Sequence, residues 1–450
     1  MTNADEAAQT KRIHVSAKHH MTIHWHRFVE NSSLPVLQTS LKVRATIVGR
    51  IGIMMLECGT GAWRVREGMD NVSRALGLTC STDVGLNSIN YTCFNKGHHY
   101  SQTLALPSTG VNTDKLHALE DYSDHFADQH LDQTAQEIHN ELDQIRDKPV
   151  NYNALVAGLA AAFACGAFVF LLGGSWVEML GAFIGAGFGH YSRRIMGKYK
   201  VTLFAKTALS VALACLVYSI VFRIMELTLH VASAHESGYI GAMLFVIPGF
   251  PLITSGLDIF KSDMRSGLER LTSAVMVIAI ATMAGWFVAM AVHLRPENFL
   301  PQNLGFWSVL VLRVLASFVG VFGFSMMFNS PAKMAGLAGI AGAVANPLRL
   351  ELVDFKTPPV VAAFVGALVA GLIASYFFVK FGLPRISLTV PAIVIMVPGL
   401  YMYRAVYNLG INNFAVGGSW LIKAIMIVVA LPLGLATARV ITDKQWRRTN

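Results

Sequence analysis

The sequence predicts a mainly α-helical, polytopic membrane protein in which a small α+β region precedes about ten transmembrane helices. The first observation is composition: 54% of the 450 residues are hydrophobic and 14% are charged, whereas a soluble protein carries about 25% charged residues. The second is distribution, because residues 1–150 hold 17 acidic and 14 basic residues, while residues 151–450 hold 10 and 22. The third is a repeat of matching residues 150 positions apart.

These patterns divide the chain into four segments. Residues 1–33 are polar and rich in His, without the apolar core of a signal peptide, and predict a disordered tail. Whether these histidines bind metal is left open. Residues 34–150 predict a cytoplasmic α+β region. Residues 151–300 and 301–450 predict two five-helix membrane units.

In the α+β region, apolar residues at helical spacing predict two helices on either side of a break at GTGA (59–62). Two strand-like runs, 88–94 and 99–107, are joined by Asn-Lys-Gly and predict a hairpin. Residues 114–128 and 132–147 are again helical in pattern.

The rest of the chain is dominated by apolar segments, each long enough to span a membrane, which takes about 20 residues. Ten of them lie near 153–173, 176–195, 202–223, 238–257, 270–293, 304–325, 331–347, 358–379, 386–405 and 419–440.

The loops between these segments predict the orientation. If residues 1–150 are cytoplasmic, the loops on the same side carry 14 Lys and Arg, and the opposite loops carry 4, as the positive-inside rule requires. Both termini are then expected in the cytoplasm of a multi-pass cell-membrane protein. The net charge of +9 therefore reflects orientation in the bilayer, and no nucleic-acid partner is expected.

A constant offset of 150 aligns the two membrane units. It pairs Pro248 with Pro398, Gly249 with Gly399, Gly267 with Gly417, Gly189 with Gly339, Gly173 with Gly323, Phe168 with Phe318 and Asp258 with Asn408. Because five is odd, the second unit would enter the membrane from the opposite side. Two inverted repeats of this kind are typical of secondary transporters.

The Pro-Gly steps at 248–249 and 398–399 interrupt two apolar segments at matching places. Proline removes a backbone hydrogen bond from a helix, and freed backbone groups in a membrane must face protein or a water-filled cavity. Interruptions in matching places of two repeats point to a transporter's binding site. The alternative is a pair of kinks without a ligand.

Four stretches resemble the threonine/serine exporter (ThrE) family. They are GRIGIMMLECGTGAWRVREGMDNVSRALGL (49–78), LPSTGVNTDKLHAL (106–119), IPGFPLITSGLDIFKSDMRSGLERL (247–271) and VPAIVIMVPGLYMYRAVYNLG (390–410). The resemblance covers nearly the whole chain after about residue 40, although the family's acidic residue after Arg-Val is displaced by one position, to Glu67. It implies export of small polar amino acids, threonine and serine, by a proton-driven antiporter that is not an enzyme.

The exported zwitterion needs partners for its carboxylate and its ammonium. Helix N-terminal amides after the two Pro-Gly steps suit the carboxylate. The candidate substrate-binding or gating residues are Pro248, Gly249, Pro251, Asp258, Pro398, Gly399, Tyr403, Arg404 and Asn408. A supporting loop contains Asp263, Gly267 and Arg270.

Acidic residues within membrane segments are costly and are candidates for proton coupling. They are Asp258, Glu178 and Glu226. Each has a structural alternative: an ion pair of Asp258 with Lys261 or Arg270, an interface position for Glu178, and a pair between Glu226 and Arg223. For Arg404 the alternative is anchoring at the interface.

Other functions stay open at this point. One is export of a small dicarboxylate such as succinate, and another is a passive channel. A third is a membrane-anchored hydrolase, although His98, His99, Asp121, Asp124 and His125 match no known catalytic or metal-binding spacing. No cofactor or metal is expected; the partners are the amino acid, protons and the lipid bilayer, and a homo-oligomer is one option.

Overall fold

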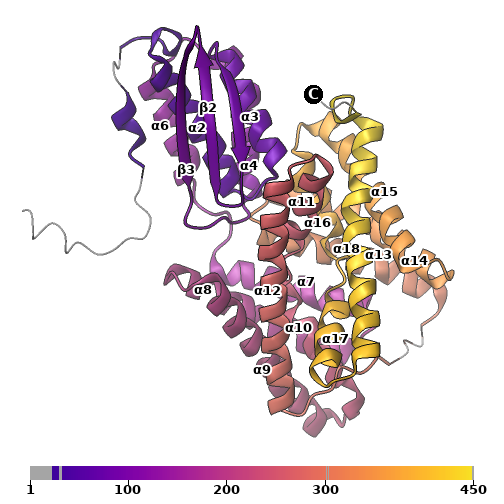
Figure 1. Cartoon of the computed structure of the whole chain (residues 1–450). Helices are drawn as coiled ribbons and strands as arrows, with labels where there is room; N and C mark the ends of the chain where they lie inside the picture. Colours follow the sequence, from indigo (N-terminus) through magenta and orange to yellow (C-terminus); the bar gives the residue numbers. More distant parts are fainter. Residues whose placement is uncertain (1–22, 30–32, 301, 303, 448–450) are drawn as a thin grey trace, which may run out of the picture.

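The computed structural model describes residues 23–29, 33–300, 302 and 304–447, and it is mainly helical. Figure 1 shows a compact α+β unit at one end of a long helical bundle, with the C terminus at the same end. We call residues 33–147 the N-terminal unit and α7 to α18 the bundle. Most of the predicted tail lies outside the described residues, but the short turn η1 (Trp25–Phe28) is described, and Trp25 is buried.

The N-terminal unit contains the elements that the sequence predicts, with one addition. Its helices are η2 (Val36–Gln38), α2 (Leu41–Glu57), α3 (Ala62–Ala75), α4 (Thr113–Asp124), α5 (Phe126–Gln129) and α6 (Ala135–Asp147). Its strands are β1 (Thr79–Val84), β2 (Ser88–Asn95) and β3 (His98–Ala105). The helices on both sides of the 59–62 break and the β2–β3 hairpin are confirmed, whereas β1 is not predicted by the sequence.

The three strands form an antiparallel sheet in the order β1-β2-β3. Along β2, Ile89, Tyr91 and Cys93 are buried, while their neighbours in the strand are more exposed. This alternation places one face of the sheet on α2 and α3. The sheet therefore supports the loop between those two helices.

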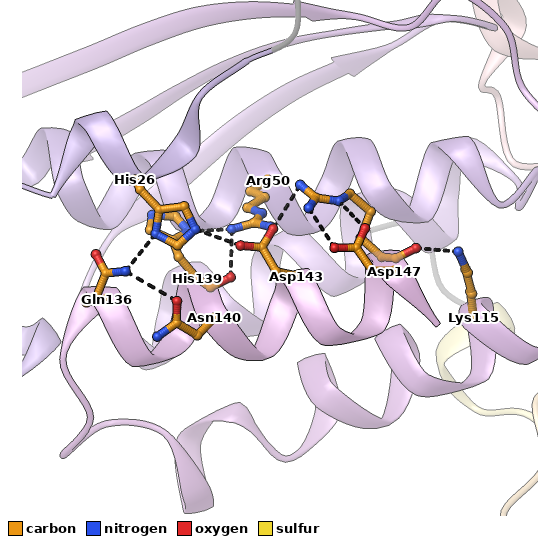
Figure 2. A network of polar contacts seen from close by, with 9 residues as sticks. His26, Arg50, Lys115, Gln136, His139, Asn140, Asp143 and Asp147 are labelled. Carbon is orange, nitrogen blue, oxygen red and sulfur yellow. Dashed lines mark hydrogen bonds and ion pairs between the residues drawn. The ribbon is translucent and has the colours of Figure 1, made fainter. Parts of the chain in front are cut away.

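A buried charge network ties α2 to α6 (Figure 2). The Arg50 side chain is fully buried and donates to the carbonyl of His139 at 2.9 Å and to Asp143 Oδ1 at 2.5 Å. His26 Nε2 lies 2.6 Å from the other oxygen of Asp143. Because a buried charge is costly without a partner, this network fixes the positions of α2, α6 and the η1 turn relative to one another.

The bundle holds two long runs of helices. The first is α7 (Ala154–Leu171), α8 (Trp176–Lys198), α9 (Leu203–Leu229), η3 (Ser233–Gly238), α10 (Tyr239–Met243), η4 (Leu244–Val246), α11 (Gly249–Phe260) and α12 (Met264–Ala291). The second is α13 (Phe306–Met327), α14 (Ala332–Asp354), α15 (Pro359–Phe381), α16 (Arg385–Val394), α17 (Gly399–Gly410) and α18 (Phe414–Thr442), followed by η5 (Gln445–Arg447).

Six of these helices are long and apolar enough to span a membrane, and up to eight spans result if each bent pair is one span, within the described part of the chain. The bent pairs are His235–Val246 with Gly249–Phe260 and Arg385–Val394 with Gly399–Gly410. The other two predicted segments coincide with α8 and α14, which contain charged residues such as Arg193 and Arg349. The structure thus supports a multi-pass membrane protein with six to eight candidate spans.

The single offset of 150 holds for only part of the bundle. Helices α11 and α17 begin 150 positions apart, at Gly249 and Gly399, but α8 and α14 begin 156 positions apart, at Trp176 and Ala332. The chain from the start of α9 to the first bent pair is six residues longer than the chain from the start of α15 to the second bent pair. The pairs Pro248–Pro398, Gly249–Gly399, Gly267–Gly417 and Asp258–Asn408 therefore occupy equivalent helix positions, whereas Gly189–Gly339, Gly173–Gly323 and Phe168–Phe318 do not.

Small residues let the bundle helices pack closely. A Cβ atom added to Gly185 would lie 2.7 Å from the carbonyl oxygen of Ala214 on α9. One added to Gly323 would lie 2.6 Å from the carbonyl oxygen of Ala160, across the α7–α13 contact. Only glycine lets these backbones approach so closely.

Candidate functional site

Each bent helix pair is interrupted at its Pro-Gly step. Pro248 precedes α11 with φ −79° and ψ 60°, and Pro398 precedes α17 with φ −79° and ψ 53°. The amides of Gly249 and Gly399 each donate to the carbonyl two residues earlier, at 2.8 Å. Because this backbone conformation is not helical and proline lacks an N–H, the spans turn by 56° and 49° at equivalent places.

The two interruptions pack against each other. A Cβ atom on Gly249 would lie 3.1 Å from Val394, just before the second interruption, and one on Gly399 would lie 2.8 Å from Leu244, just before the first. A hydrogen bond from the Tyr239 hydroxyl to Tyr403 Oη, 2.8 Å long, also joins the two bent pairs. The space left between them is only about 10 Å³, so the middle of the bundle is closed.

A large cavity of about 820 Å³ leads to the first interruption from the side of the N-terminal unit. Pro248, Gly249 and Pro251 line it, together with Gly59 and Gly110 of the N-terminal unit. The charged residues among its described lining are all basic: Arg193, Arg194, Lys198, Lys206 and Arg270. This cavity is therefore suited to an anionic group.

A smaller cavity of about 450 Å³ lies at the other end of α7 and reaches the start of α17. Leu400, Arg404, Arg313 and Asp354 line it. The charged residues among its described lining are two arginines and one aspartate, and Arg313 donates to Asp354 at 2.6 Å. The two cavities thus approach the two interruptions from opposite ends of the bundle.

Asp258 lies where the bundle meets the N-terminal unit. It is fully buried, and its Oδ1 accepts a hydrogen bond at 2.9 Å from the amide of Ala62, the first residue of α3. Its Oδ2 accepts from Ser266 Oγ at 2.9 Å and lies 3.6 Å from Arg270 Nε. The carboxylate thus caps α3, whose own N-cap residue Gly61 has no side chain.

The supporting loop makes the rest of this contact. Arg270 donates to the carbonyls of Gly59 and Thr60, each at 2.9 Å, and Arg66 donates to Asp263 at 2.6 Å. Gly267 lets the start of α12 pack on α11, since a Cβ atom there would lie 2.6 Å from the Ile259 side chain. Two of the family-like stretches, 49–78 and 247–271, therefore form one interface.

The other two acidic candidates also have fixed partners. Glu178 is fully buried near the start of α8, where it accepts from the backbone amide of Ser175 at 2.9 Å and lies 2.7 Å from His235 Nδ1. Glu226 accepts from Arg223 at 2.6 Å, as the alternative reading of the sequence predicts. Neither glutamate lines the large cavity.

Among the candidates on α17, the side chain of Arg404 donates to the carbonyl of Glu297 at 3.0 Å and lines the small cavity. Asn408 bonds to the carbonyl of Arg404 within its own helix, at 2.8 Å. The structure thus brings Pro248, Gly249 and Pro251 to the large cavity and Arg404 to the small one. Asp258 and Asp263 instead contact the N-terminal unit.

Sequence reasoning missed the residues that give the large cavity its character. Arg193, Arg194 and Lys198 are counted only toward the positive-inside rule, and His190 is not among the candidate residues. The signal that could have identified them is their helical spacing. Arg193, Arg194 and Gly197 follow His190 by three, four and seven positions, so all four residues share one side of α8. All four line the large cavity.

Comparisons with known proteins identify the family of the chain. Residues 46–293 match the family described as "Putative threonine/serine exporter", and residues 313–441 match "Threonine/Serine exporter, ThrE". A "Probable threonine/serine exporter" of Mycobacterium tuberculosis (strain ATCC 25618 / H37Rv) is 23% identical over 86% of this chain and 74% of its own. A "Threonine/serine exporter" of Corynebacterium glutamicum is 23% identical over 61% of this chain and 58% of its own.

A further relative has a different described substrate. The "Probable succinate transporter subunit YjjP" of Escherichia coli (strain K12) is 24% identical over 54% of this chain and 91% of its own. No solved structure matches the chain.

Proposed function

Because the chain belongs to the threonine/serine exporter family, and is therefore a membrane transporter and not an enzyme, we propose that it exports small amino acids, threonine and serine, at the expense of the proton gradient. The observation that carries this proposal is the pair of Pro-Gly interruptions that meet in the closed middle of the bundle, with a cavity on either side. A solute that moves between two such cavities needs a site that opens to one end at a time.

The N-termini of α11 and α17 are the proposed contacts for the solute's carboxylate. Each of these helices has 12 residues and begins at a Pro-Gly step, and the first unpaired amides of a helix favour a negative group. Pro248 and Gly249 would act from the large cavity, and Pro398 and Gly399 in the state that opens to the other end. Tyr403 and Arg404 would close the second path.

The arrangement of the bundle supports ten spans in two inverted repeats. Each half has the same order of elements, three helices, a bent pair and one long helix, and equivalent residues next to the two interruptions make equivalent contacts. In this arrangement the N-terminal unit and both termini would face the cytoplasm of a cell-membrane protein, and the large cavity would open there.

A second candidate substrate is a small dicarboxylate such as succinate. The observation that favours it is the lining of the large cavity, in which the charged residues described are all basic. A dicarboxylate would use two of these cations, whereas an amino acid also brings an ammonium group that they repel.

The test is uptake of labelled threonine, serine and succinate into proteoliposomes, with and without an imposed pH gradient. Gradient-dependent accumulation of threonine or serine would support the first candidate, and accumulation of succinate alone would support the second. Arg194→Gln should reduce the flux of either solute at least several-fold, because it removes a cavity cation, whereas Arg295→Gln, on an exposed loop, should not. Absence of all three fluxes would overturn the proposal.

A further inference from the structure

Helices α8 and α14 carry a matching pair of polar residues. Each helix has 23 residues, and the two begin 156 positions apart. At this offset His190 corresponds to Asn346, and Arg193 corresponds to Arg349. Each helix therefore has a polar side chain that is followed by an arginine one turn later, on the same side. The first pair lines the large cavity, whereas neither Asn346 nor Arg349 lines the small one.

Asn346 is fully buried next to the helix that leads into the second interruption. Its Nδ2 donates to Ser317 Oγ of α13 at 2.9 Å, but its Oδ1 has no hydrogen-bond partner among the described residues. Gly342, one turn earlier, faces α16, since a Cβ atom there would lie 3.4 Å from the carbonyl oxygen of Ala392. Because an unpaired buried acceptor is costly, the Asn346 oxygen points to a ligand as its partner.

Arg349 lies at the same break, one turn further along α14. A Cβ atom on Gly366 of α15 would lie 3.2 Å from Arg349 Cβ and 3.1 Å from the sulfur of Met396, two residues before Pro398. Arg349 Nε is buried without a partner, and no hydrogen bond or ion pair joins the guanidinium to any other residue that the structure describes. A cation without a counter-charge is costly in a membrane segment and marks a functional position.

The neighbouring arginines differ from Arg349 because they have partners. Arg313 donates to Glu351 at 2.7 Å, and Arg404 donates to a backbone carbonyl at 3.0 Å. The titratable side chains that act on Arg349 electrostatically are Tyr401 and Arg313, and neither is a carboxylate. Tyr401 belongs to the first turn of α17. A carboxylate is the group that an unpaired guanidinium and a helix N-terminus would both bind.

We propose that Arg349 and Asn346 form a second binding site for the exported solute, used when the path opens toward the small cavity. This inference rests on the proposed function. When the two halves exchange conformations, Arg349 takes the place that Arg193 has in the large cavity and binds the carboxylate of the solute. Asn346 Oδ1 accepts a hydrogen bond from the hydroxyl of threonine or serine, a neutral donor that the arginine does not repel.

Solute affinity at each face of the membrane tests the role of Arg349. Exchange of labelled threonine, and of succinate as a second carboxylate probe, gives the KM for external solute in right-side-out and in inverted vesicles, against vesicles without the protein. Arg349→Gln should raise the KM at least about tenfold at one face, because a charge-assisted pair is lost. Arg193→Gln should raise it at the opposite face.

Two further variants support this comparison. Arg349→Lys keeps the charge but loses the planar fork of the guanidinium, so it should cause a smaller rise at the same face, including when Arg349→Gln does not insert. Arg295→Gln, on an exposed loop, is the matched control and should leave both KM values unchanged.

The role of Asn346 is tested with 2-aminobutyrate, which is threonine without its hydroxyl. A site that binds a hydroxyl discriminates against the analogue that lacks it. In the unmodified protein 2-aminobutyrate should therefore compete with labelled threonine more weakly than unlabelled threonine does, at the face that Arg349→Gln affects. Asn346→Leu removes the acceptor and should abolish this difference. Equal competition by the two compounds in the unmodified protein would overturn the role of Asn346.

The outcomes separate this site from the proposed function. Solute exchange by Arg349→Gln with unchanged KM at both faces, or effects of Arg349→Gln and Arg193→Gln at the same face, would overturn the second site and leave the proposed function standing. An unmodified protein that moves neither threonine, serine nor succinate would overturn the proposed function, and this inference with it.

Discussion

At the residue scale, Cys80 and Cys93 form a cross-strand pair whose reactivity can be measured. They face each other on β1 and β2, and the Cys93 thiol donates to Cys80 Sγ at 3.6 Å. This hydrogen bond lowers the pKa of Cys80 to about 7, against the opposing effect of burial. Because the thiolate is the nucleophile, we expect Cys80 to react with iodoacetamide at pH 7.

Replacing the donor should slow this reaction. Without the Cys93 thiol the pKa of Cys80 returns toward its ordinary value, so Cys93→Ala should lower the alkylation rate at pH 7 by about tenfold. Cys93→Ser keeps a donor and is the matched control. Mass spectrometry of the labelled peptide measures the rate; equal rates in Cys93→Ala and the unmodified protein would contradict the geometry of the pair.

A second prediction concerns acid. Burial, together with the neighbouring Arg50, lowers the pKa of His139 to about 3, while the unfolded chain takes up this proton near pH 6.5. The free energy of unfolding of the N-terminal unit should therefore fall as pH decreases from about 6.5 toward 3, by at most about 1.4 kcal/mol per unit. Burial alone would raise the pKa of Asp143, but hydrogen bonds from His26 and Arg50 hold it below its ordinary value, so its contribution is also lost in acid.

Hydrogen exchange of the α2 and α6 peptides, corrected for the intrinsic rate, measures this stability in the full chain. Protection should be lower at pH 4.5 than at pH 7. His125→Gln, at an exposed position, should keep the same difference. Equal protection at both pH values would show that His139 is not held neutral.

Asp258 shows how far single residues can be interpreted from sequence. Its pairing with Arg270 is foreseeable, because the two residues lie 12 positions apart in one family-like stretch. Its bond to the amide of Ala62 joins residues 196 positions apart. No local pattern marks that contact, because a backbone amide has no signature in the sequence.

At the element scale, the loop between α2 and α3 should be sensitive to added volume. A Cβ atom on Gly61 would lie 2.6 Å from Asp258 Oδ1, and the neighbouring backbone leaves little room for the carboxylate to move, since it is bonded to Ala62 and Ser266. Gly61→Ala should destabilise the docking of the N-terminal unit by about 1–3 kcal/mol.

The control for this change lies in the same region. A Cβ atom on Gly110 would meet nothing within 4 Å, so Gly110→Ala should change stability by less than about 0.5 kcal/mol. Thermal unfolding and protease cleavage of the link at 148–153 measure both variants. Equal stability of the two would mean that Asp258 does not cap α3.

The elements that the sequence predicts are those with long apolar periodicity. The bundle helices and α2, α3, α4 and α6 belong to this group. Strand β1, TCSTDV, has one large apolar residue and is largely polar, so its pairing with β2 defines it more than its own pattern does. The constant offset of 150 does not fit α8 and α14, because the chain near α9 contains extra residues. Matching residues at one fixed offset cannot detect such an insertion.

At the scale of the whole molecule, the N-terminal unit contacts both halves of the bundle. It holds the α11–α12 turn through Asp258 and Asp263. It also holds the α13–α14 turn, where the Asn329 side chain donates to Asn112 at 3.0 Å and Thr113 bonds to Ser330 at 2.7 Å. If the halves move relative to each other during transport, these contacts must rearrange, which links the N-terminal unit to the opening of the large cavity.

The proposed sidedness of the two cavities leads to a labelling experiment. Ser273 lines the large cavity and Asn298 the small one. In a Cys80→Ser background, whose other native cysteines are buried, a membrane-impermeant maleimide should label Asn298→Cys from outside right-side-out vesicles and Ser273→Cys only in inverted vesicles. Since the middle of the bundle leaves about 10 Å³, the reagent cannot pass from one cavity to the other. Labelling of both positions from the same side would contradict a path with one cavity on each side of the membrane. Labelling of Ser273→Cys in right-side-out vesicles and of Asn298→Cys only in inverted vesicles would mean that the orientation is opposite to the one that the positive-inside rule predicts.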